Sequence, residues 1–207
     1  MIKVKICGIT NSADAQVSVK AGCDALGFIF YKKSPRYISP GEACTIIKKI
    51  PSRIIKIGVF VNNKEDYIKR IAKLCRLDML QFHGNESARF CASFRDYKII
   101  KTFRIKDKSS LKNILKYKLF AYLFDTYVKS KIGGTGKVFN WKLVRHIKGL
   151  TRPVFLSGGL NAENVNRAVA VVSPEWVDAS SSLEASPGKK DHKKVKQFIK
   201  VAKKLKS

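Results

Sequence analysis

The strongest constraint on the fold of this chain is a regular alternation of short apolar runs with amphipathic segments of helical period. Eight apolar runs have the length of a strand, at 2–7, 25–30, 54–61, 78–82, 98–103, 119–125, 153–158 and 175–180. Helix-like segments lie between and after them, at 12–21, 41–50, 63–75, 86–94, 109–117, 140–147, 161–172 and 191–205. Strands that alternate with helices form parallel sheets, because each helix carries the chain back to the edge where strands begin.

Eight strand–helix units in one continuous stretch predict a single (β/α)₈ TIM barrel, an α/β fold, as one domain over residues 1–207. The composition has no Pro-rich or Ser-rich linker that would divide the chain. A doubly wound open sheet is the alternative, but no glycine-rich dinucleotide motif follows the first strand. Asparagines in the pairs Asn11-Ser12, Asn62-Asn63 and Asn85-Glu86, and Asn161, predict where four of the helices begin.

A glycine-rich stretch, KIGGTGKVFNW at 131–141, has part of the pattern of an ATP-binding phosphate loop. That pattern needs a glycine at its first position and a serine or threonine after the lysine, to reach Mg²⁺. Lys131 stands at the glycine position and Val138 at the hydroxyl position. A branched alkyl side chain cannot coordinate magnesium, so this loop has a different role.

The formal net charge of +27 makes nucleic-acid binding the first function to consider. Lysine carries most of this excess, whereas phosphate and base recognition favour the planar fork of arginine. The densest basic run, at 189–206, also has the pattern of an amphipathic helix, with apolar residues at Val195, Phe198, Ile199, Ala202 and Leu205. We therefore expect no nucleic-acid partner, and a general attraction of anionic metabolites.

The five cysteines are scattered, with no CxxC pair and no Cys/His spacing typical of a zinc site. This pattern predicts reduced thiols and no bound metal. The N-terminal sequence MIKVKICGIT alternates like a strand and lacks the apolar core of a signal peptide. No apolar run approaches the ~20 residues that cross a bilayer. We expect a cytoplasmic protein without a membrane partner.

An enzyme built on this fold has its active site where the strands end. The segments that follow the predicted strands are rich in small, polar and charged residues: CGIT, YKKSPRY, HGNE, DTYVKSKIGGTGKVFNW, SGGL and SSSLEASPGKKD. Together with GVFVN, they stand in the order found in the phosphoribosylanthranilate isomerase family of tryptophan biosynthesis, which this chain resembles over essentially its whole length. The resemblance implies an Amadori rearrangement of a phosphorylated small-molecule substrate, N-(5-phosphoribosyl)anthranilate, that needs no cofactor and no metal.

The resemblance also implies roles for individual residues. Cys7 matches the family's general base and Asp125 its general acid. Arg36 is expected to bind the substrate's aromatic carboxylate, because a guanidinium binds a carboxylate with two parallel hydrogen bonds. The remaining expected contacts are His83 and Asp178 with the substrate, Gly158, Gly159, Ser180, Ser181 and Ser182 with its phosphate, and a mobile loop containing Gly133, Gly134 and Gly136.

Two further residues bear on the geometry of this site. The family usually has glycine where Ser182 stands, so a positive φ at this position would strain the serine. Residues 3, 5 and 7 share one face of the first strand, which predicts that Lys5 points into the barrel beneath Cys7. An ammonium there would favour the thiolate. A buried carboxylate that pairs with Lys5 is the alternative.

Two other functions compete with this interpretation. The histidine-pathway isomerase catalyses the same type of rearrangement on a related barrel, but that family has an aspartate where Cys7 lies. A basic barrel that binds nucleic acid without catalytic activity is the second, and the presence of both Cys7 and Asp125 argues against it. Family members occur as monomers or homodimers, and the sequence does not distinguish the two states.

Overall fold

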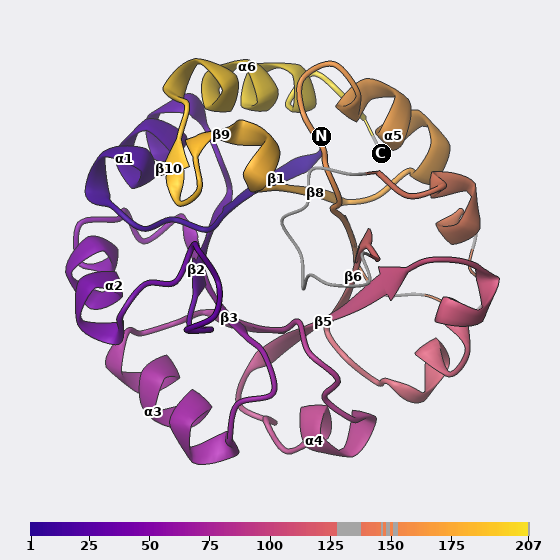
Figure 1. The fold of residues 1–207 in the computed structure, drawn as a ribbon, viewed down its shortest axis with the longest axis horizontal. Helices are drawn as coiled ribbons and strands as arrows, with labels where there is room; N and C mark the ends of the chain where they lie inside the picture. Colours follow the sequence, from indigo (N-terminus) through magenta and orange to yellow (C-terminus); the bar gives the residue numbers. More distant parts are fainter. Residues whose placement is uncertain (128–137, 146, 148–149, 151–152, 207) are drawn as a thin grey trace.

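The eight main strands of the computed structural model form a closed, all-parallel barrel in the order β1-β2-β3-β4-β5-β6-β7-β8, with helices around the outside (Figure 1). The structure describes residues 1–127, 138–145, 147, 150 and 153–206. The strands are β1 (Lys3–Cys7), β2 (Ala25–Ile29), β3 (Ile55–Phe60), β4 (Met79–Phe82), β5 (Lys98–Ile105), β6 (Ala121–Thr126), β7 (Val154–Leu156) and β8 (Trp176–Ala179). The predicted (β/α)₈ barrel is therefore confirmed, and the open sheet is wrong.

Six α-helices surround this barrel within the described residues. They are α1 (Ser12–Ala21), α2 (Pro40–Ile47), α3 (Glu65–Leu74), α4 (Ala88–Ala92), α5 (Val165–Val172) and α6 (His192–Ala202). The β1–β8 pairing closes the barrel, with Lys5 in register with Asp178. A backbone hydrogen bond from Ile2 to the carbonyl of Leu205 joins the beginning and end of the chain.

Alternation along the strands separates two apolar layers. Small and bulky side chains fill the inside of the barrel, namely Ala25, Ile57, Met79, Ile100, Ala121, Leu123, Phe155 and Trp176. The larger cluster lies between the strands and the helices. Side chains two positions further along the same strands therefore point to the same interior, one layer nearer the carboxyl ends. Those positions include Asp125 and Asp178.

Two predicted helices are not α-helices. The segment 109–117 forms two short 3₁₀ turns, η1 (Lys108–Leu111) and η2 (Ile114–Lys116). Asn113 between them has a left-handed backbone with φ of 67°, which interrupts any helix. In the segment 140–147, the structure describes one 3₁₀ turn, η3 (Trp141–Val144), which ends where Arg145 becomes extended.

The cap predictions are correct in one case and wrong in three. Asn11 caps α1, because its side chain accepts a hydrogen bond from the backbone N–H of Asp14. Helix α3 instead starts after Lys64, and α4 starts after Ser87, whose side chain caps it. Asn161 stabilises a turn before α5 rather than capping the helix itself.

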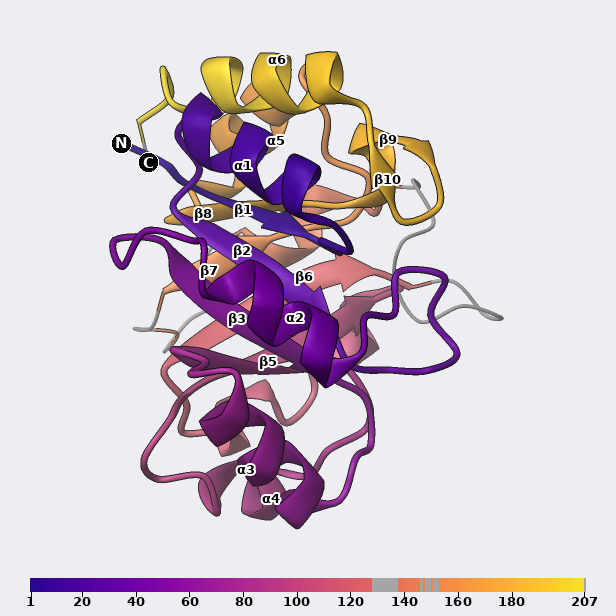
Figure 2. The same cartoon turned by 90° about the vertical axis from the view of Figure 1, so that its left-hand side faces the viewer.

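After β8, the chain adds a 3₁₀ turn, η4 (Ser181–Leu183), and a small hairpin of β9 (Glu184–Ser186) and β10 (Lys189–Lys190). The hairpin lies at the end of the barrel opposite the N-terminus (Figure 2). This is the end where the barrel strands finish. No described helix combines the length and apolar character needed to cross a membrane.

Candidate active site

One cavity at the carboxyl ends of the strands brings together the predicted catalytic residues and the predicted substrate contacts, and we call it the barrel-mouth cavity. Its lining includes Cys7, Arg36, His83, Asp125 and Asp178. They come from β1, the loop after β2, the residue that follows β4, β6 and β8, so the closed barrel brings together residues that are far apart in the chain. The thiol and the carboxyl that the sequence proposes as base and acid thus face one common space.

Cys7 ends β1, beside a glycine on the neighbouring strand. A Cβ atom at Gly27 would lie 2.7 Å from the Cys7 sulfur, so the absence of a side chain there leaves room for the thiol. Gly8 has φ of 74°, which lets the chain turn away directly after the cysteine. The two glycines near Cys7 therefore leave space for the thiol in the lining of the barrel-mouth cavity.

Lys5 points into the barrel beneath Cys7, as strand parity predicts. Its side chain is fully buried, and Nζ lies 2.9 Å from Asp178 Oδ2. Burial alone would lower the pKa of Lys5, but Asp178 and Cys7 raise it further than burial lowers it. Lys5 therefore pairs with a buried carboxylate and also contacts the thiol, so both alternatives for this lysine hold together.

The expected thiolate is not favoured in the free protein. Burial raises the pKa of the Cys7 thiol, and the Lys5 ammonium lowers it only in part. Asp178 raises the pKa of Cys7 as well, because a nearby negative charge opposes a second one. The pKa of Cys7 consequently lies above its ordinary value: Lys5 favours the thiolate, as the sequence predicts, but its effect is smaller than that of burial.

Asp125 lies opposite, on β6, between a backbone donor and a histidine. Its Oδ1 accepts a 2.8 Å hydrogen bond from the N–H of Thr126. His83 Nε2 lies 3.2 Å from the other carboxylate oxygen, within ion-pair distance but not aligned as a hydrogen bond. Gln81 Nε2 lies 3.1 Å from His83 Nδ1, so a donated hydrogen bond there leaves the imidazole proton on Nε2, toward Asp125.

Arg36 is held by a buried charge network that the sequence analysis does not foresee. Its Nε and Nη2 each donate a 2.8 Å hydrogen bond to a different oxygen of Glu184. Lys190 Nζ lies 3.0 Å from Glu184 Oε1 and donates to the carbonyl of Ser180. Burial would raise the pKa of Glu184, but Arg36 and Lys190 together lower it below its ordinary value. Arg36 can therefore offer a ligand only its remaining N–H groups, chiefly those of Nη1.

The predicted phosphate residues also meet at one place. A small cavity beside the barrel-mouth cavity is lined by Ser157, Gly158, Gly159, Ser180, Ser181 and Ser182, together with Asp125 and Asp178. Gly158 and Gly159 have φ of 91° and 66°, a conformation that favours glycine. A Cβ atom at Gly158 would lie 2.3 Å from Thr126 Oγ1, so no larger residue fits there.

Ser182 does not take the left-handed conformation, so the departure from glycine carries no φ strain. Its hydroxyl donates to the carbonyl of Leu160 on the neighbouring loop. Ser180 Oγ and Asp178 Oδ1 are buried and have no hydrogen-bond partner among the described residues. Buried polar atoms that face a cavity without a partner are available to a ligand.

The glycine-rich loop with Gly133, Gly134 and Gly136 lies outside the described residues. Sequence reasoning missed Gln81, Glu184, Lys190 and Gly27. Gln81 could have been found from strand parity, because it is two residues before His83 on β4. Nothing in the local sequence signals the Arg36–Glu184 pair, whose members lie 148 positions apart.

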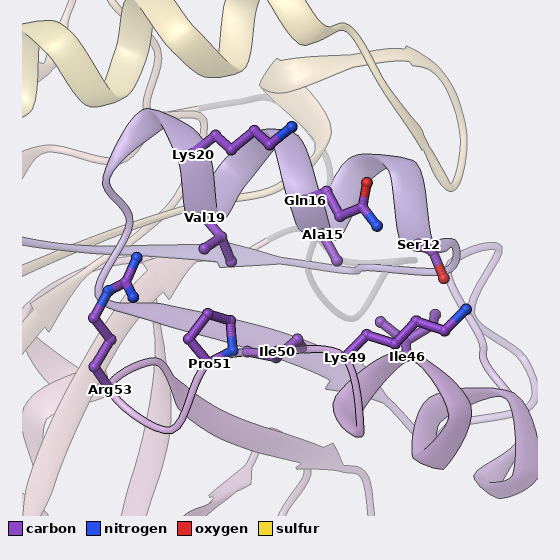
Figure 3. A pocket seen from close by; sticks show the side chains of 10 residues that line it. All are labelled: Ser12, Ala15, Gln16, Val19, Lys20, Ile46, Lys49, Ile50, Pro51 and Arg53. Carbon is purple, nitrogen blue, oxygen red and sulfur yellow. The ribbon is translucent and has the colours of Figure 1, made fainter.

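A separate groove lies on the outside of the barrel, between α1 and the segment that follows α2 (Figure 3). It has a volume of about 290 Å³ and an apolar floor that includes Val19, Ile50 and Pro51. Lysine and arginine side chains surround this floor, and its lining contains no carboxylate, histidine or cysteine. Acid–base chemistry therefore belongs to the barrel mouth and not to this groove.

Comparison with known proteins agrees with this geometry. Residues 4–201 match the family model for N-(5'phosphoribosyl)anthranilate (PRA) isomerase. The chain belongs to this family. A relative from Geobacter sp. (strain M21), named N-(5'-phosphoribosyl)anthranilate isomerase, is 47% identical over 99% of this chain and 100% of its own.

Solved structures of the family are also similar to this chain. The crystal structure of phosphoribosyl anthranilate isomerase from Thermotoga maritima is 44% identical, with a TM-score of 0.93 over 99% of this chain and 100% of its own. A phosphoribosyl anthranilate isomerase in complex with reduced 1-(o-carboxyphenylamino)-1-deoxyribulose 5-phosphate is 42% identical, with a TM-score of 0.90 and the same coverage. The family assignment favours the tryptophan-pathway enzyme over the histidine-pathway isomerase.

Proposed function

We propose that this protein catalyses the Amadori rearrangement of N-(5-phosphoribosyl)anthranilate to 1-(2-carboxyphenylamino)-1-deoxyribulose 5-phosphate in L-tryptophan biosynthesis. The observation that carries this proposal is the shared cavity of Cys7 and Asp125, in a chain that belongs to the PRA isomerase family. Substrate and product are isomers, so the reaction moves protons within one molecule and consumes no external oxidant or reductant.

Asp125 supplies the first proton. Its carboxyl group protonates the furanose ring oxygen, the C1–O bond breaks, and the nitrogen lone pair forms an iminium with C1. The imidazole of His83 lies 3.2 Å from the second carboxylate oxygen, on the side of the cavity where the substrate binds. A positioned acid of this kind contributes roughly 10²–10⁴-fold to the rate.

Cys7 removes the proton from C2 of the iminium. The C2–H electrons form the C1–C2 double bond of an enolamine, which then tautomerises to the ketone. Because the thiol has a raised pKa, it must first release its proton to solvent water before it acts as a base. Lys5, beneath the sulfur, stabilises the thiolate when it forms.

The two ends of the substrate bind on opposite sides of these groups. Arg36 takes the aromatic carboxylate through the N–H groups that Glu184 leaves free. The phosphate binds among Gly158, Gly159 and the serines 180–182, where the Ser180 hydroxyl lacks a partner. Asp178, which lines both cavities, contacts the sugar.

We further propose that residues 1–207 act as one domain, as a monomer or homodimer in the cytoplasm, without a nucleic-acid partner. Several acidic residues pair with buried lysine side chains inside the protein. Few carboxylates therefore remain on the surface to neutralise the exposed lysines. A specific nucleic-acid complex would show a steep loss of affinity with rising salt.

The test is the loss of substrate fluorescence in a continuous assay. Wild type is expected to convert the substrate. Cys7→Ala and Asp125→Asn are each expected to lower kcat by at least about 10²-fold, since each removes one proton transfer. No conversion by wild type would refute the proposed function, and equal rates in all three proteins would refute the proposed roles.

Matched controls separate chemistry from folding. Cys23→Ala removes another buried thiol, and Asp96→Asn another carboxylate, neither of which lines the barrel-mouth cavity. Both control variants are expected to keep the wild-type kcat.

A further inference from the structure

Two cysteines that the proposed chemistry does not use lie in direct contact. Cys44, in α2, and Cys75, the residue that follows α3, have their sulfur atoms 2.7 Å apart. These helices are neighbours on the outside of the barrel (Figure 1). A disulfide bond has a length of about 2.05 Å, so the sulfur atoms need to approach by only about 0.7 Å more. The structure describes all five cysteines, and no other two of them are in contact.

The surroundings of the pair favour one order of reaction. Cys44 is partly exposed, whereas Cys75 is buried and only 1% exposed. Burial and the neighbouring Cys44 raise the pKa of Cys75 to about 12. The Cys75 sulfur also lies 3.4 Å from the carbonyl oxygen of Pro40, which fixes its position beside α2. A reagent in solution therefore meets Cys44 first, and Cys75 stays poised to react with the product.

We propose that Cys44 and Cys75 form an oxidative modification site, at which a hydroperoxide converts the two thiols to an intramolecular disulfide. The Cys44 sulfur attacks the hydroperoxide, the O–O bond breaks, and the products are Cys44 sulfenic acid and an alcohol, or water from hydrogen peroxide. The Cys75 sulfur then attacks the sulfenic sulfur, the S–O bond breaks, and water leaves. The two thiols supply the two electrons that the hydroperoxide accepts.

The bond would link α2 to the end of α3 across 31 positions of the chain. Closing such a loop restricts the unfolded chain and stabilises the folded protein. Neither cysteine lines the barrel-mouth cavity, so this modification is independent of the proposed isomerase roles. We expect the oxidised protein to melt roughly 5–10 °C above the reduced protein.

Hydrogen peroxide in slight excess over native protein tests the proposal. Free thiols in the denatured product are expected to fall from five to three, and peptide mapping by mass spectrometry is expected to find the Cys44–Cys75 linkage. A melting scan with and without a reductant then measures the stabilisation. Five remaining thiols, or a cross-link between different cysteines or between chains, would overturn the proposal.

Two variants sharpen the result. Cys44→Ser changes a partly exposed residue and is expected to fold, to form no disulfide and to show no gain in Tm. Cys23→Ala removes a buried thiol without a sulfur neighbour and is expected to keep both the linkage and the gain. An equal gain in Tm for Cys44→Ser would show that the stabilisation does not come from this bond.

Discussion

At the scale of single residues, the reactivity of Cys7 depends on charges beneath it in the barrel interior. Burial raises the pKa of the thiol, Lys5 and Lys190 lower it, and Asp178 raises it. These groups come from β1, β8 and the β9–β10 hairpin, so the closed sheet brings the charges together. The proton on Cys7 is therefore controlled by charged residues from three separate parts of the chain.

Replacing Lys5 with methionine is expected to raise the pKa of Cys7 further. The substitution removes the ammonium that lowers this pKa and leaves the Asp178 carboxylate without its 2.9 Å partner. Because only the thiolate is alkylated, the midpoint of Cys7 alkylation should move to higher pH, with the rate below the midpoint falling about tenfold for each pKa unit. Mass spectrometry of protein treated with iodoacetamide at a series of pH values measures the extent of Cys7 alkylation and so its midpoint.

Lys3→Met is the matched control, because Lys3 lies on the same strand but is exposed. Its midpoint should equal that of wild type. An unchanged midpoint in Lys5→Met would contradict the conclusion that the Lys5 ammonium lowers the pKa of Cys7.

The site residues that could be identified from the sequence are those that lie at the carboxyl end of a predicted strand. Cys7, His83, Asp125 and Asp178 follow apolar runs directly, so their position at the barrel mouth could be predicted. Glu184 could not, because its partner Arg36 lies 148 positions away and the pair depends on barrel closure. Removing one partner of such a buried pair costs about 3–5 kcal/mol, because the other charge stays buried alone.

At the scale of elements, β2 contributes a glycine, Gly27, whose lack of a side chain leaves room for the Cys7 thiol. A Cβ atom at Gly27 would lie 2.7 Å from Cys7 Sγ and 3.2 Å from the Lys5 side chain. Gly27→Ala is therefore expected to displace the thiol, lower kcat by at least about tenfold, and destabilise the fold by roughly 1–3 kcal/mol through overpacking. Urea unfolding and the fluorescence assay measure the two effects.

Gly41→Ala provides the comparison within α2. Nothing lies within 4 Å of a Cβ atom at Gly41. Alanine favours a helix over glycine by up to ~1 kcal/mol, so this variant should be slightly more stable and fully active. Loss of activity in both variants, or in neither, would contradict the steric role of Gly27.

The elements that sequence misread are those with weak local signals. The segments 109–117 and 140–147 have apolar residues at helical spacing, yet the described parts are 3₁₀ turns. In the first, Asn113 takes a left-handed conformation that residue spacing alone does not reveal. In the second, one short 3₁₀ turn already places Trp141 and Val144 in buried positions. A full helix is therefore not needed to cover the barrel at these residues.

At the scale of the whole molecule, the number of strand–helix units predicts that the barrel closes. The alternation of side chains along each strand predicts which of them point into the barrel. The net charge of +27 has no such structural explanation. Five acidic residues are buried, and these are Asp14, Glu86, Asp125, Asp178 and Glu184. The surface is thus short of acidic partners for its lysines, and like charges repel one another across it.

Screening this repulsion should stabilise the protein. Raising KCl from ~20 mM to ~300 mM shortens the reach of surface charges from about 20 Å to about 6 Å. Buried pairs such as Lys5–Asp178 are screened much less than exposed charges, so repulsion is weakened more than attraction. We expect Tm to rise by roughly 2–5 °C over this range.

A charge variant of α6 tests whether repulsion is the cause. Lys193, Lys196 and Lys200 lie on its exposed face, and among the described residues none of them forms a side-chain hydrogen bond or ion pair. Replacing all three with glutamate lowers the net charge by two units at each position and keeps the apolar face of the helix. The variant should melt above wild type at low salt and respond less to KCl. A wild-type Tm that falls with salt, or equal salt dependence in the two proteins, would show that attractive surface pairs outweigh the lysine excess.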